Sequence, residues 1–344
     1  DTLGGGEKYM LTLASCLSDE HKVYVLWNDH SVLEKAGERF GIDTSRIEFA
    51  HDTFTTHASF VQRFMTSQQF DVFFYLSDGS VPWLFAKKNI LLFQFPVPWV
   101  TRSFTTRAKF KNIHAVIANS AFVKTHIDSK FHVNSDVITP PVSLIPHSNT
   151  KKEQIILTVG RFTTGMNMKK QEEMITAFKK MCDAGLKQWK FVLIGSSLEK
   201  DADFVEKIKE SAKGYPIEIH NNASHKKLIE LYQKAMIYWH AAGFGEDLEK
   251  YPERSEHFGI STVEAMSAGC VPIVYNGGGQ PEIVTEKKNG FLWNTEKELA
   301  AFTQKLIHDT SSIKAYAKQA TKRAEEFREE KFCQRIQNMV NAEL

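Results

Sequence analysis

Two glutamates stand at a spacing that suits the recognition of hydroxyl groups. Glu256 and Glu264 are eight positions apart in the stretch EHFGISTVEAMSAG, with Gly259 between them. Ser261 or Thr262 is placed to cap a helix. We therefore expect Glu256 on the loop that enters the helix and Glu264 on its first turns. The free N–H groups and the dipole of that helix would bind an anion, while the two acids accept sugar or ribose hydroxyls.

Two cations follow an earlier predicted strand. Arg161 comes directly after Gly160 at the end of that strand, and Lys169 lies eight residues further on. An arginine and a lysine so placed can converge on one diphosphate, the arginine as a two-pronged donor and the lysine as a point charge. Taken alone, a surface arginine and a lysine that begins a helix are the more ordinary interpretation.

Glycine clusters occur at two predicted turns. Residues 277–279 follow the predicted strand 271–275, and Gly4, Gly5 and Gly6 precede a helical pattern. Glycines let a backbone approach a ligand and expose N–H groups, although each cluster also fits a flexible turn. Only three residues precede the first cluster, so we expect that the first strand of the N-terminal domain is missing from this sequence.

Short apolar strands alternate with longer helical patterns along the chain. This alternation is typical of α/β proteins and predicts two doubly wound domains with parallel sheets. The Pro-rich stretch 139–150 is interpreted as the linker between them. The predicted strands are 23–27, 71–76, 90–93, 115–118, 155–159, 191–194, 217–219, 236–239 and 271–275.

In this order, the motifs resemble those of retaining glycosyltransferases with the GT-B fold, in the family 4 group (glycosyl transferases group 1). The match covers nearly the whole chain: E-x7-E at Glu256 and Glu264, VGRF…K ending at Lys169, and NGFL at 289–292. The resemblance implies two Rossmann-like domains facing a central cleft. An acceptor-binding domain would occupy 1–145 and a nucleotide-sugar-binding domain 146–312, with helices at 313–344 packing back on the N-terminal domain.

The resemblance also implies roles for individual residues. Glu256 would contact the donor sugar near the reacting carbon, and Glu264 would bind the nucleotide ribose. Arg161 and Lys169 would neutralise the diphosphate, so that the catalytic residues would be Glu256, Arg161 and Lys169. The other positions implied at the donor site are Gly4, Gly5, Gly6, Gly160, Phe258, Gly259 and Ile260.

Gln94 marks a departure from the family. It follows the predicted strand 90–93, where the family often has a histidine. A glutamine cannot take a proton at neutral pH. This fits a front-face retaining mechanism in which the departing phosphate oxygen accepts the proton of the acceptor. If that alignment is wrong, the alternative residues are His51, His57 and His114.

The charge distribution bears on the partners. The formal net charge of +2 gives no overall field that would attract nucleic acid. The segment 83–130, however, combines aromatic residues with eight cations and a single acid, Asp128. This favours an anionic membrane surface or a phosphate-bearing acceptor, while core aromatics beside solvated cations are the alternative. The cations are Lys87, Lys88, Arg102, Arg107, Lys109, Lys111, Lys124 and Lys130.

The remaining composition limits other classes of protein. The four cysteines, Cys16, Cys182, Cys270 and Cys333, are far apart and are expected to be buried thiols of a reducing compartment. No apolar run reaches the roughly 18 residues of a membrane span, so a cytoplasmic or peripheral location is expected. No Asp-x-Asp motif or histidine cluster indicates a metal site, so neither a metal nor a cofactor besides the nucleotide-sugar substrate is expected.

The expected function is the transfer of a hexose from GDP-mannose or a UDP-hexose to a glycan or lipid-linked saccharide. The sequence EHFGI, together with residues 239–245 before it, resembles the corresponding sequence of family members that extend lipid-linked or cell-surface oligosaccharides. The alternatives are a GT-B-like sugar-nucleotide epimerase or phosphorylase, and a non-catalytic subunit that binds a sugar nucleotide. The E-x7-E spacing favours transfer, whereas Gln94 and the missing first strand keep the binding subunit open.

Overall fold

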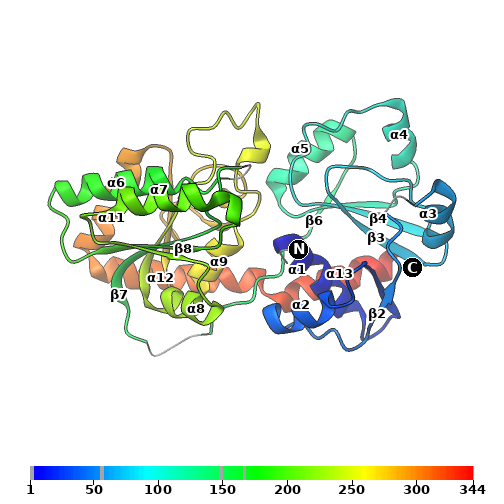
Figure 1. Ribbon diagram of the computed structural model, residues 1–344, viewed down its shortest axis with the longest axis horizontal. Helices are drawn as coiled ribbons and strands as arrows, with labels where there is room; N and C mark the ends of the chain where they lie inside the picture. Colours follow the sequence, from blue (N-terminus) through cyan, green and yellow to red (C-terminus); the bar gives the residue numbers. More distant parts are fainter. Residues whose placement is uncertain (1–3, 55–57, 147–149, 166–167, 344) are drawn as a thin grey trace. The chain divides into compact units, whose positions relative to one another are not determined.

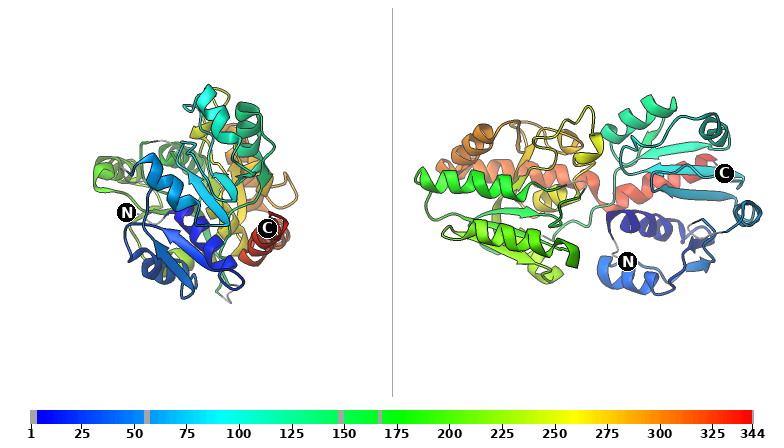
Figure 2. Two further views of the ribbon diagram at one scale, coloured as in Figure 1. Left: turned by 90° about the vertical axis from the view of Figure 1, so that its right-hand side faces the viewer. Right: turned by 45° about the horizontal axis from the view of Figure 1, so that its top comes forward.

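The computed structural model describes residues 4–54, 58–146, 150–165 and 168–343, and the chain divides into two α/β units. The N-terminal unit consists of Asp1–Pro141 together with Glu329–Leu344, and the C-terminal unit is Val142–Arg328. In each unit, helices cover both faces of parallel β-structure (Figure 1, Figure 2). This is the doubly wound architecture expected from the sequence.

The N-terminal unit is built on parallel strands. The strands are β1 (Val23–Leu26), β2 (Ile47–Ala50), β3 (Val72–Ser77), β4 (Lys88–Phe93), β5 (Ala115–Ala118) and β6 (Asp136–Val137). The helices are α1 (Gly5–Leu17), α2 (Val32–Phe40), α3 (Phe60–Ser67), α4 (Phe104–Phe110), α5 (Ala121–Phe131) and α13 (Glu329–Glu343). In the described residues β1 pairs with β2, and a second sheet has the order β3-β4-β5-β6. Residues 1–3, on which the expectation of a missing strand depends, lie outside the described part.

Strand β4 contributes alternate residues to two hydrophobic cores, one on each face of its sheet. Ile90 and Leu92 pack on the face covered by α1 and α13, whereas Leu91 and Phe93 pack on the face covered by α5. Successive side chains of a strand point to opposite faces, so a strand buried on both faces needs apolar residues throughout. For this reason the last four residues of β4, 90–93, form a continuous apolar run.

The C-terminal unit contains one parallel sheet in the order β12-β11-β10-β7-β8-β9. Its strands are β7 (Glu153–Val159), β8 (Lys190–Gly195), β9 (Ile217–Asn221), β10 (Ala235–His240), β11 (Val271–Tyr275) and β12 (Phe291–Trp293). Its α-helices are α6 (Gln171–Asp183), α7 (Ala202–Ala212), α8 (His225–Lys234), α9 (Ile260–Ser267), α10 (Gln280–Ile283), α11 (Glu296–His308) and α12 (Thr310–Ala324). Short 3₁₀ turns are η1 (Glu199–Asp201), η2 (Pro252–Arg254) and η3 (Glu325–Phe327).

The strand order of this sheet defines where a ligand should bind. From β7 the chain adds β8 and β9 on one side and then returns to add β10, β11 and β12 on the other. The topological switch point therefore lies between β7 and β10, and ligands of doubly wound sheets bind outside the carboxyl ends of the strands at such a point. Gly160 follows β7 there, and His240 ends β10.

The boundary between the units falls after Pro141 rather than after residue 145. Val142 is buried in the core of the C-terminal unit, and its N–H donates to the Phe327 carbonyl oxygen at 3.0 Å. The second part of the Pro-rich stretch therefore begins the C-terminal fold, because its apolar side chains have a core to enter. Residues 147–149 of that stretch lie outside the described residues.

The C-terminal helices divide between the two units, which corrects the expectation for 313–344. Helix α12 packs against α9 within the C-terminal unit, where Ala320 and Ala324 are fully buried. Small alanine side chains let the two helices approach closely, so α12 stays with this core. Only α13 joins the N-terminal unit, where it packs against α1.

Two of the four cysteines form a disulfide, so the expectation of four free thiols was wrong. Cys16 on α1 and Cys333 on α13 are bonded, with their Cα atoms 5.2 Å apart. The packing of α1 against α13 brings together cysteines that are 317 positions apart in the sequence. Disulfides persist mainly in oxidising compartments. The cysteines therefore do not support a reducing compartment, and the cytoplasmic location stays a prediction.

Candidate functional site

Three polar side chains meet at the switch point of the C-terminal sheet. Lys169 Nζ lies 2.6 Å from Glu256 Oε2, and His240 Nε2 lies 2.7 Å from the same oxygen. The side chains of Lys169 and Glu256 are 15% and 13% exposed, and that of His240 is 2% exposed. Lys169 comes from the loop after β7, His240 ends β10, and Glu256 lies on the loop before α9. The structure thus brings two of the expected donor-site residues into direct contact.

This cluster keeps the Glu256 carboxylate ionised. Burial raises the pKa of Glu256, but the Lys169 ammonium and the His240 hydrogen bond outweigh burial, so the pKa falls below its usual range. Burial lowers the pKa of His240 although Glu256 opposes this shift, so the imidazole is neutral at pH 7. The neutral ring donates its Nε2–H to Glu256, and Nδ1 is buried with no partner among the described residues.

One oxygen of Glu256 is left for a ligand. Lys169 and His240 both bind Oε2, whereas Oε1 accepts no hydrogen bond from any described residue. A carboxylate that is fixed through one oxygen presents the other in a defined direction. Such a group can accept a hydroxyl of a bound sugar without having to be ordered first.

Gly160 makes room for the Lys169 side chain. A Cβ on Gly160 would lie 2.6 Å from Lys169 Cγ, which is too close for any other residue type without displacement of the lysine. The next residue, Lys170, has a φ of 57° and places its Nζ 2.7 Å from Glu246 Oε1. Arg254 binds the other oxygen of Glu246 at 3.0 Å. This second group of ion pairs fixes the turn into α6 and so the position of Lys169.

Helix α9 begins at a glycine rather than at the expected Ser261 or Thr262. Its N-cap is Gly259, whose φ of 125° favours glycine. The Ser261 hydroxyl instead forms a 2.8 Å hydrogen bond with the Tyr238 hydroxyl. Because glycine has no side chain to cap the helix, the N–H groups of Ile260 and Ser261 have no acceptor among the described residues. These donors remain available to an anion.

Glu264 lies on the first turns of α9, as expected, and is oriented by a tyrosine. Tyr232 on α8 donates its hydroxyl to Glu264 Oε2 at 2.9 Å. Burial, reinforced by the Glu264 charge, raises the pKa of Tyr232, so the phenol remains a donor. Burial also raises the pKa of Tyr238, and the charges of both Glu256 and Glu264 raise it further. Tyr238 and His240 both lie on β10, and they contact Ser261 of α9 and Glu256, so the loop and the helix that carry the two acids meet at this strand.

Arg161 stays outside this cluster. Its side chain is exposed and forms no ion pair with a described residue, and its carbonyl oxygen accepts a hydrogen bond from Gln171 Nε2 at 2.9 Å. The convergence of Arg161 and Lys169 on a diphosphate thus stays a prediction. Phe258, also expected at the site, has its side chain buried against Phe327. Only the backbone of Phe258 remains for a ligand.

The glycines at 277–279 support Glu256. A Cβ on Gly278 would lie 2.1 Å from the Glu256 carbonyl oxygen, and one on Gly279 would lie 2.6 Å from the His257 carbonyl oxygen. The N–H of Gly279 donates to the Glu256 carbonyl oxygen at 2.7 Å. This loop packs its glycines on the backbone that carries Glu256, so the expectation that they free N–H groups for a ligand does not hold for Gly279.

The N-terminal glycines lie beside Gln94 in the N-terminal unit. A Cβ on Gly6 would be 3.0 Å from Gln94 Oε1. The N–H of Gly4 donates to Glu7 Oε2 at 2.8 Å, so one donor of this loop is already used by a neighbouring acid. Gln94 directly follows β4, at the carboxyl edge of its sheet, where ligands of doubly wound sheets bind.

The alternative histidines have different positions in the N-terminal unit. His114 precedes β5, and its Nδ1 accepts a hydrogen bond from the Asn89 N–H at 3.1 Å. It therefore lies at the edge opposite to the one that binds ligands. His51 follows β2 and lies at the carboxyl edge. His57 lies outside the described residues.

Sequence reasoning missed His240, Tyr232 and Tyr238 as parts of the site. His240 ends an apolar strand, and a polar residue at the carboxyl end of a buried parallel strand is a signal that could have identified it. The two tyrosines gave no such signal, because tyrosine is common in buried strands and helices. In the described part of the chain, no group of three His, Cys, Asp or Glu side chains is arranged to hold a metal ion.

Comparison with known proteins identifies the family and the fold. The family described as "Glycosyl transferases group 1" matches residues 144–323, more than half of the chain. The chain therefore belongs to the glycosyl transferases group 1 family. Its fold is GT-B, with two Rossmann-like domains: it superposes on HepE of Anabaena in complex with UDP with a TM-score of 0.74, at 17% identity and over 99% and 97% of the two chains. A glycosyltransferase from Rickettsia africae gives a TM-score of 0.76, at 17% identity over 99% and 96%.

Curated relatives are mannosyltransferases. The GDP-Man:Man(3)GlcNAc(2)-PP-Dol alpha-1,2-mannosyltransferase of Neurospora crassa is 26% identical over 254 residues, which are 69% of this chain and 43% of that protein. The Alpha-1,3/1,6-mannosyltransferase ALG2 of Dictyostelium discoideum is 31% identical over 120 residues, 35% of this chain and 27% of that protein. The chain thus spans less than half the length of the curated relatives it matches.

Proposed function

We propose that the chain transfers mannose from GDP-mannose to a saccharide that is linked to a lipid through a diphosphate. The observation that carries this proposal is the Lys169–Glu256–His240 cluster at the switch point, followed by the free N–H groups of α9. Relatives whose names specify GDP-Man and a diphosphate-linked lipid acceptor support the choice of donor and acceptor. A UDP-hexose is the alternative donor.

The proposed reaction retains configuration and needs no base. The bond between the anomeric carbon and the diphosphate oxygen breaks, and a bond from that carbon to the acceptor oxygen forms on the same face. The proton of the acceptor hydroxyl goes to the departing phosphate oxygen. Gln94, which lies at the carboxyl edge of the N-terminal sheet, would hydrogen-bond the acceptor without taking this proton.

Side chains and backbone would supply the charge that a metal supplies elsewhere. Negative charge develops on the leaving diphosphate, and fixed donors stabilise it most effectively when they are ordered beforehand. Glu256 already balances Lys169, so the exposed guanidinium of Arg161 would add the net positive charge. The free N–H groups of Ile260 and Ser261 would add two more donors. We therefore propose that transfer is independent of divalent metals.

The two acids would bind hydroxyls. Glu256 Oε1 would accept a hydroxyl of the sugar close to the reacting carbon, because its other oxygen is held by Lys169 and His240. Glu264, held by Tyr232, would accept the ribose hydroxyls of the nucleotide. This division matches the positions of the two residues, one on the loop and one on the first turns of α9.

Release of GDP from GDP-mannose, measured with and without a diphosphate-linked saccharide acceptor, tests the proposal. Lys169→Ala and Arg161→Ala should each lower kcat at least about a hundredfold, the scale for losing one ordered electrostatic donor. Lys180→Ala, an exposed site on α6, is the matched control and should stay near wild type. Activity should survive a chelator. Near-normal turnover in both variants would contradict the diphosphate assignment.

Other outcomes of the same assay separate the alternatives. Nucleotide binding without release that depends on acceptor would identify a non-catalytic binding subunit. Release of UDP from a UDP-hexose, without release of GDP from GDP-mannose, would show that the donor is the UDP-hexose. An isomerised sugar nucleotide, or a sugar phosphate formed with inorganic phosphate, would identify an epimerase or a phosphorylase.

We also propose that the N-terminal unit works at an anionic membrane surface through residues 83–130. None of the helices in the described residues has the length and apolar character needed to cross a membrane. A lipid-linked acceptor nevertheless requires the enzyme to reach the surface of a bilayer. Neutralising Arg102, Arg107, Lys109 and Lys111 together should weaken binding to anionic vesicles, and unchanged binding would refute this part of the proposal.

A further inference from the structure

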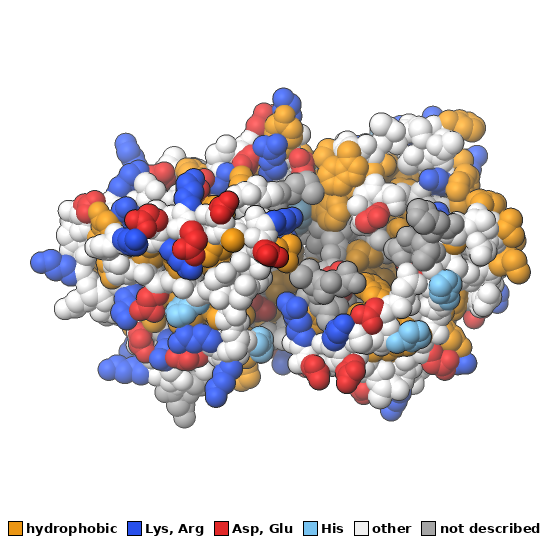
Figure 3. Space-filling model, in the orientation of Figure 1, with side chains coloured by type: hydrophobic (Ala, Val, Ile, Leu, Met, Phe, Trp, Pro, Cys, Tyr) orange, Lys and Arg blue, Asp and Glu red, His pale blue; other side chains and the backbone are white. Residues whose placement is uncertain are grey.

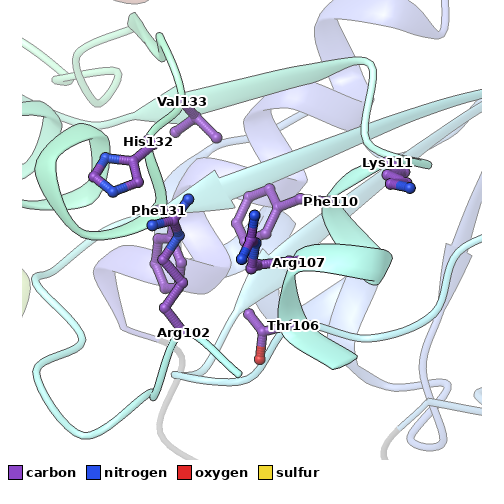
Figure 4. A pocket seen from close by; sticks show the side chains of 8 residues that line it. All are labelled: Arg102, Thr106, Arg107, Phe110, Lys111, Phe131, His132 and Val133. Carbon is purple, nitrogen blue, oxygen red and sulfur yellow. The ribbon is translucent and has the colours of Figure 1, made fainter. Parts of the chain in front are cut away.

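A pocket of about 280 Å³ opens between α4 and the end of α5 in the N-terminal unit. Phe110 and Phe131 form its apolar wall, with their ring centroids 4.9 Å apart. Arg102, from the segment before α4, and Arg107, on α4, extend into the space beside these rings, and Lys111 lines the same pocket (Figure 4). These positions combine a flat apolar wall with a cationic rim.

The cations of this pocket have no partners among the residues that the structure describes. The side chains of Arg102, Arg107 and Lys111 form no ion pair or hydrogen bond with any described residue. Residues 79–127 contain seven Lys and Arg residues and no acid. The next acid along the chain, Asp128, is held by Lys124 at 2.6 Å and by the Ser135 N–H at 2.9 Å. An anion that enters the pocket would therefore meet uncompensated positive charge.

The chemistry of the rim specifies the kind of anion. Two guanidinium groups offer paired N–H donors that match the oxygens of a phosphate, and a lysine adds a point charge. The carboxyl end of the α5 dipole lies close by, but it carries only roughly half a charge, against three full positive charges. The position of the rim is fixed, because Lys130 of α5 donates to the Pro98 carbonyl oxygen at 2.7 Å and so joins α5 to the segment before α4.

The pocket lies away from the edge of the sheet that binds substrates. Helix α5 begins at Ala121, just after the carboxyl end of β5, and ends at Phe131. At 1.5 Å per residue, the end of this 11-residue helix is roughly 16 Å from that edge. Ligands of doubly wound sheets bind at the carboxyl edge. A phosphate in this pocket is therefore distinct from the diphosphate of a bound acceptor.

An exposed aromatic side chain lies beside the pocket. Phe104, which begins α4 between Arg102 and Arg107, is 85% exposed. Figure 3 shows hydrophobic side chains along the upper and right-hand margin of the N-terminal unit. Among the described residues the exposed large hydrophobics of the N-terminal unit are Phe60, Val61 and Met65 on α3, Trp99, and Phe104, and Leu198 is the one in the other unit.

We propose that this pocket binds the headgroup phosphate of an anionic membrane phospholipid, while Phe104 enters the interfacial layer of the bilayer. A phosphate site with an exposed aromatic side chain beside it fits a lipid, whose phosphate lies directly above its apolar region, better than a water-soluble phosphate. The inference rests on the proposed action at a membrane surface. The pocket would add a specific phosphate-binding site to the nonspecific electrostatic attraction between the cations of the unit and the membrane.

Vesicle binding by the full chain tests the pocket. Vesicles of phosphatidylcholine with phosphatidic acid are compared with vesicles of phosphatidylcholine alone. The variant Arg102→Gln/Arg107→Gln should bind the anionic vesicles at least about tenfold more weakly than wild type, since each cation at such a surface contributes appreciably. The matched control is Lys22→Gln/Arg46→Gln, which removes two exposed charges of the same unit outside the pocket. Phe104→Ser should weaken binding as well.

The outcomes separate this inference from the proposal on which it rests. If wild type ignores the anionic vesicles, the proposed membrane function fails. If wild type binds and the pocket variant matches its control, membrane binding stands but the pocket has no part in it. If the pocket variant instead raises the KM for a short-chain, water-soluble diphosphate acceptor, the pocket belongs to the acceptor. The last two results each overturn the inference.

Discussion

Lys169 of the C-terminal unit and the pocket cations of the N-terminal unit are in opposite situations. Lys169 is buried against Glu256 and His240, whereas Arg102 and Arg107 are exposed and unpaired among the described residues. A buried charge is tolerated only with a partner, so the first cluster is ordered before any ligand arrives. An exposed charge needs no partner and remains available to a large external surface. The difference teaches that buried, paired charges form a site that is ordered for one small ligand. Exposed, unpaired cations instead form a surface that can contact an extended anionic partner.

The two units also differ in how the chain builds them. The C-terminal unit is one continuous segment, but the N-terminal unit joins Asp1–Pro141 to Glu329–Leu344. The Cys16–Cys333 disulfide links those two segments, while the cysteines of the C-terminal unit are free. Covalent closure of the N-terminal unit and ion pairing in the C-terminal unit should therefore respond to different perturbations.

Breaking the buried cluster should have the largest effect on stability. Glu256→Gln leaves the Lys169 ammonium buried without its counter-charge, so we expect the free energy of unfolding of the C-terminal unit to fall by about 3–5 kcal/mol. Urea unfolding followed by tryptophan fluorescence measures this change. The double variant Lys169→Met/Glu256→Gln should be less destabilised than the sum of the single variants. Strict additivity would show that the two groups do not depend on each other.

Removing the Cys16–Cys333 disulfide should have the next largest effect on stability. Cys16→Ser/Cys333→Ser frees α13 from α1, and we expect the N-terminal unit to lose about 2–4 kcal/mol of stability, because the unfolded chain is no longer constrained. Hydrogen exchange of α1 and α13 measures the loss in that unit. Cys182→Ser, at a free cysteine, is the control. Equal protection of both helices in the double variant and in wild type would contradict a structural role for the bond.

The pH dependence of unfolding sharpens the comparison further. Burial lowers the pKa of His240 below the ordinary 6.5, so the unfolded chain binds a proton that the folded chain does not, and stability falls as the pH drops below 6.5. This one group contributes up to about 1.4 kcal/mol per pH unit. His240→Gln should flatten the slope between pH 6.5 and 5, whereas His225→Gln, at an exposed position, should not. Parallel curves of stability against pH for wild type and both variants would exclude His240 as a source of this pH dependence.

An exposed ion pair should have the smallest effect. Lys87 and Asp71 form a 2.6 Å pair, but their side chains are mostly exposed. Solvent screens such a pair, and ordering two long side chains opposes it. Lys87→Gln should therefore leave the urea midpoint within experimental error of wild type. A clear shift of the midpoint would mean that this exposed ion pair contributes measurably to the stability of the N-terminal unit, contrary to the contrast drawn with Lys169.

Much of the fold follows from local patterns in the sequence. The predicted strand at 90–93 is part of β4, and the strand at 155–159 is part of β7. Glu256 lies on the loop before α9 and Glu264 on its first turns, as the glycine between them indicated. These features depend on neighbours only a few positions away, so periodicity and turn chemistry are enough to find them.

Other features could not be read in this way. The choice of Gly259 as N-cap depends on a φ of 125°, and the Ser261 hydroxyl is drawn to Tyr238, which lies on another strand. The split of the C-terminal helices between the units depends on where Ala320 and Ala324 find a helix to contact. Each depends on a contact between distant parts of the chain, which no short window contains.

By itself, the sequence determined the class of fold and the family, and it led to the two acids and the lysine of the proposed donor site, because apolar periodicity and short motifs are properties of neighbouring residues. Only the tertiary structure decided that His240 and Lys169 share one oxygen of Glu256, that Cys16 meets Cys333, and that Arg102 and Arg107 line a pocket beside two aromatic rings. The physical reason is that burial and the pairing of charges arise when strands and helices pack, and packing joins residues that the sequence keeps far apart.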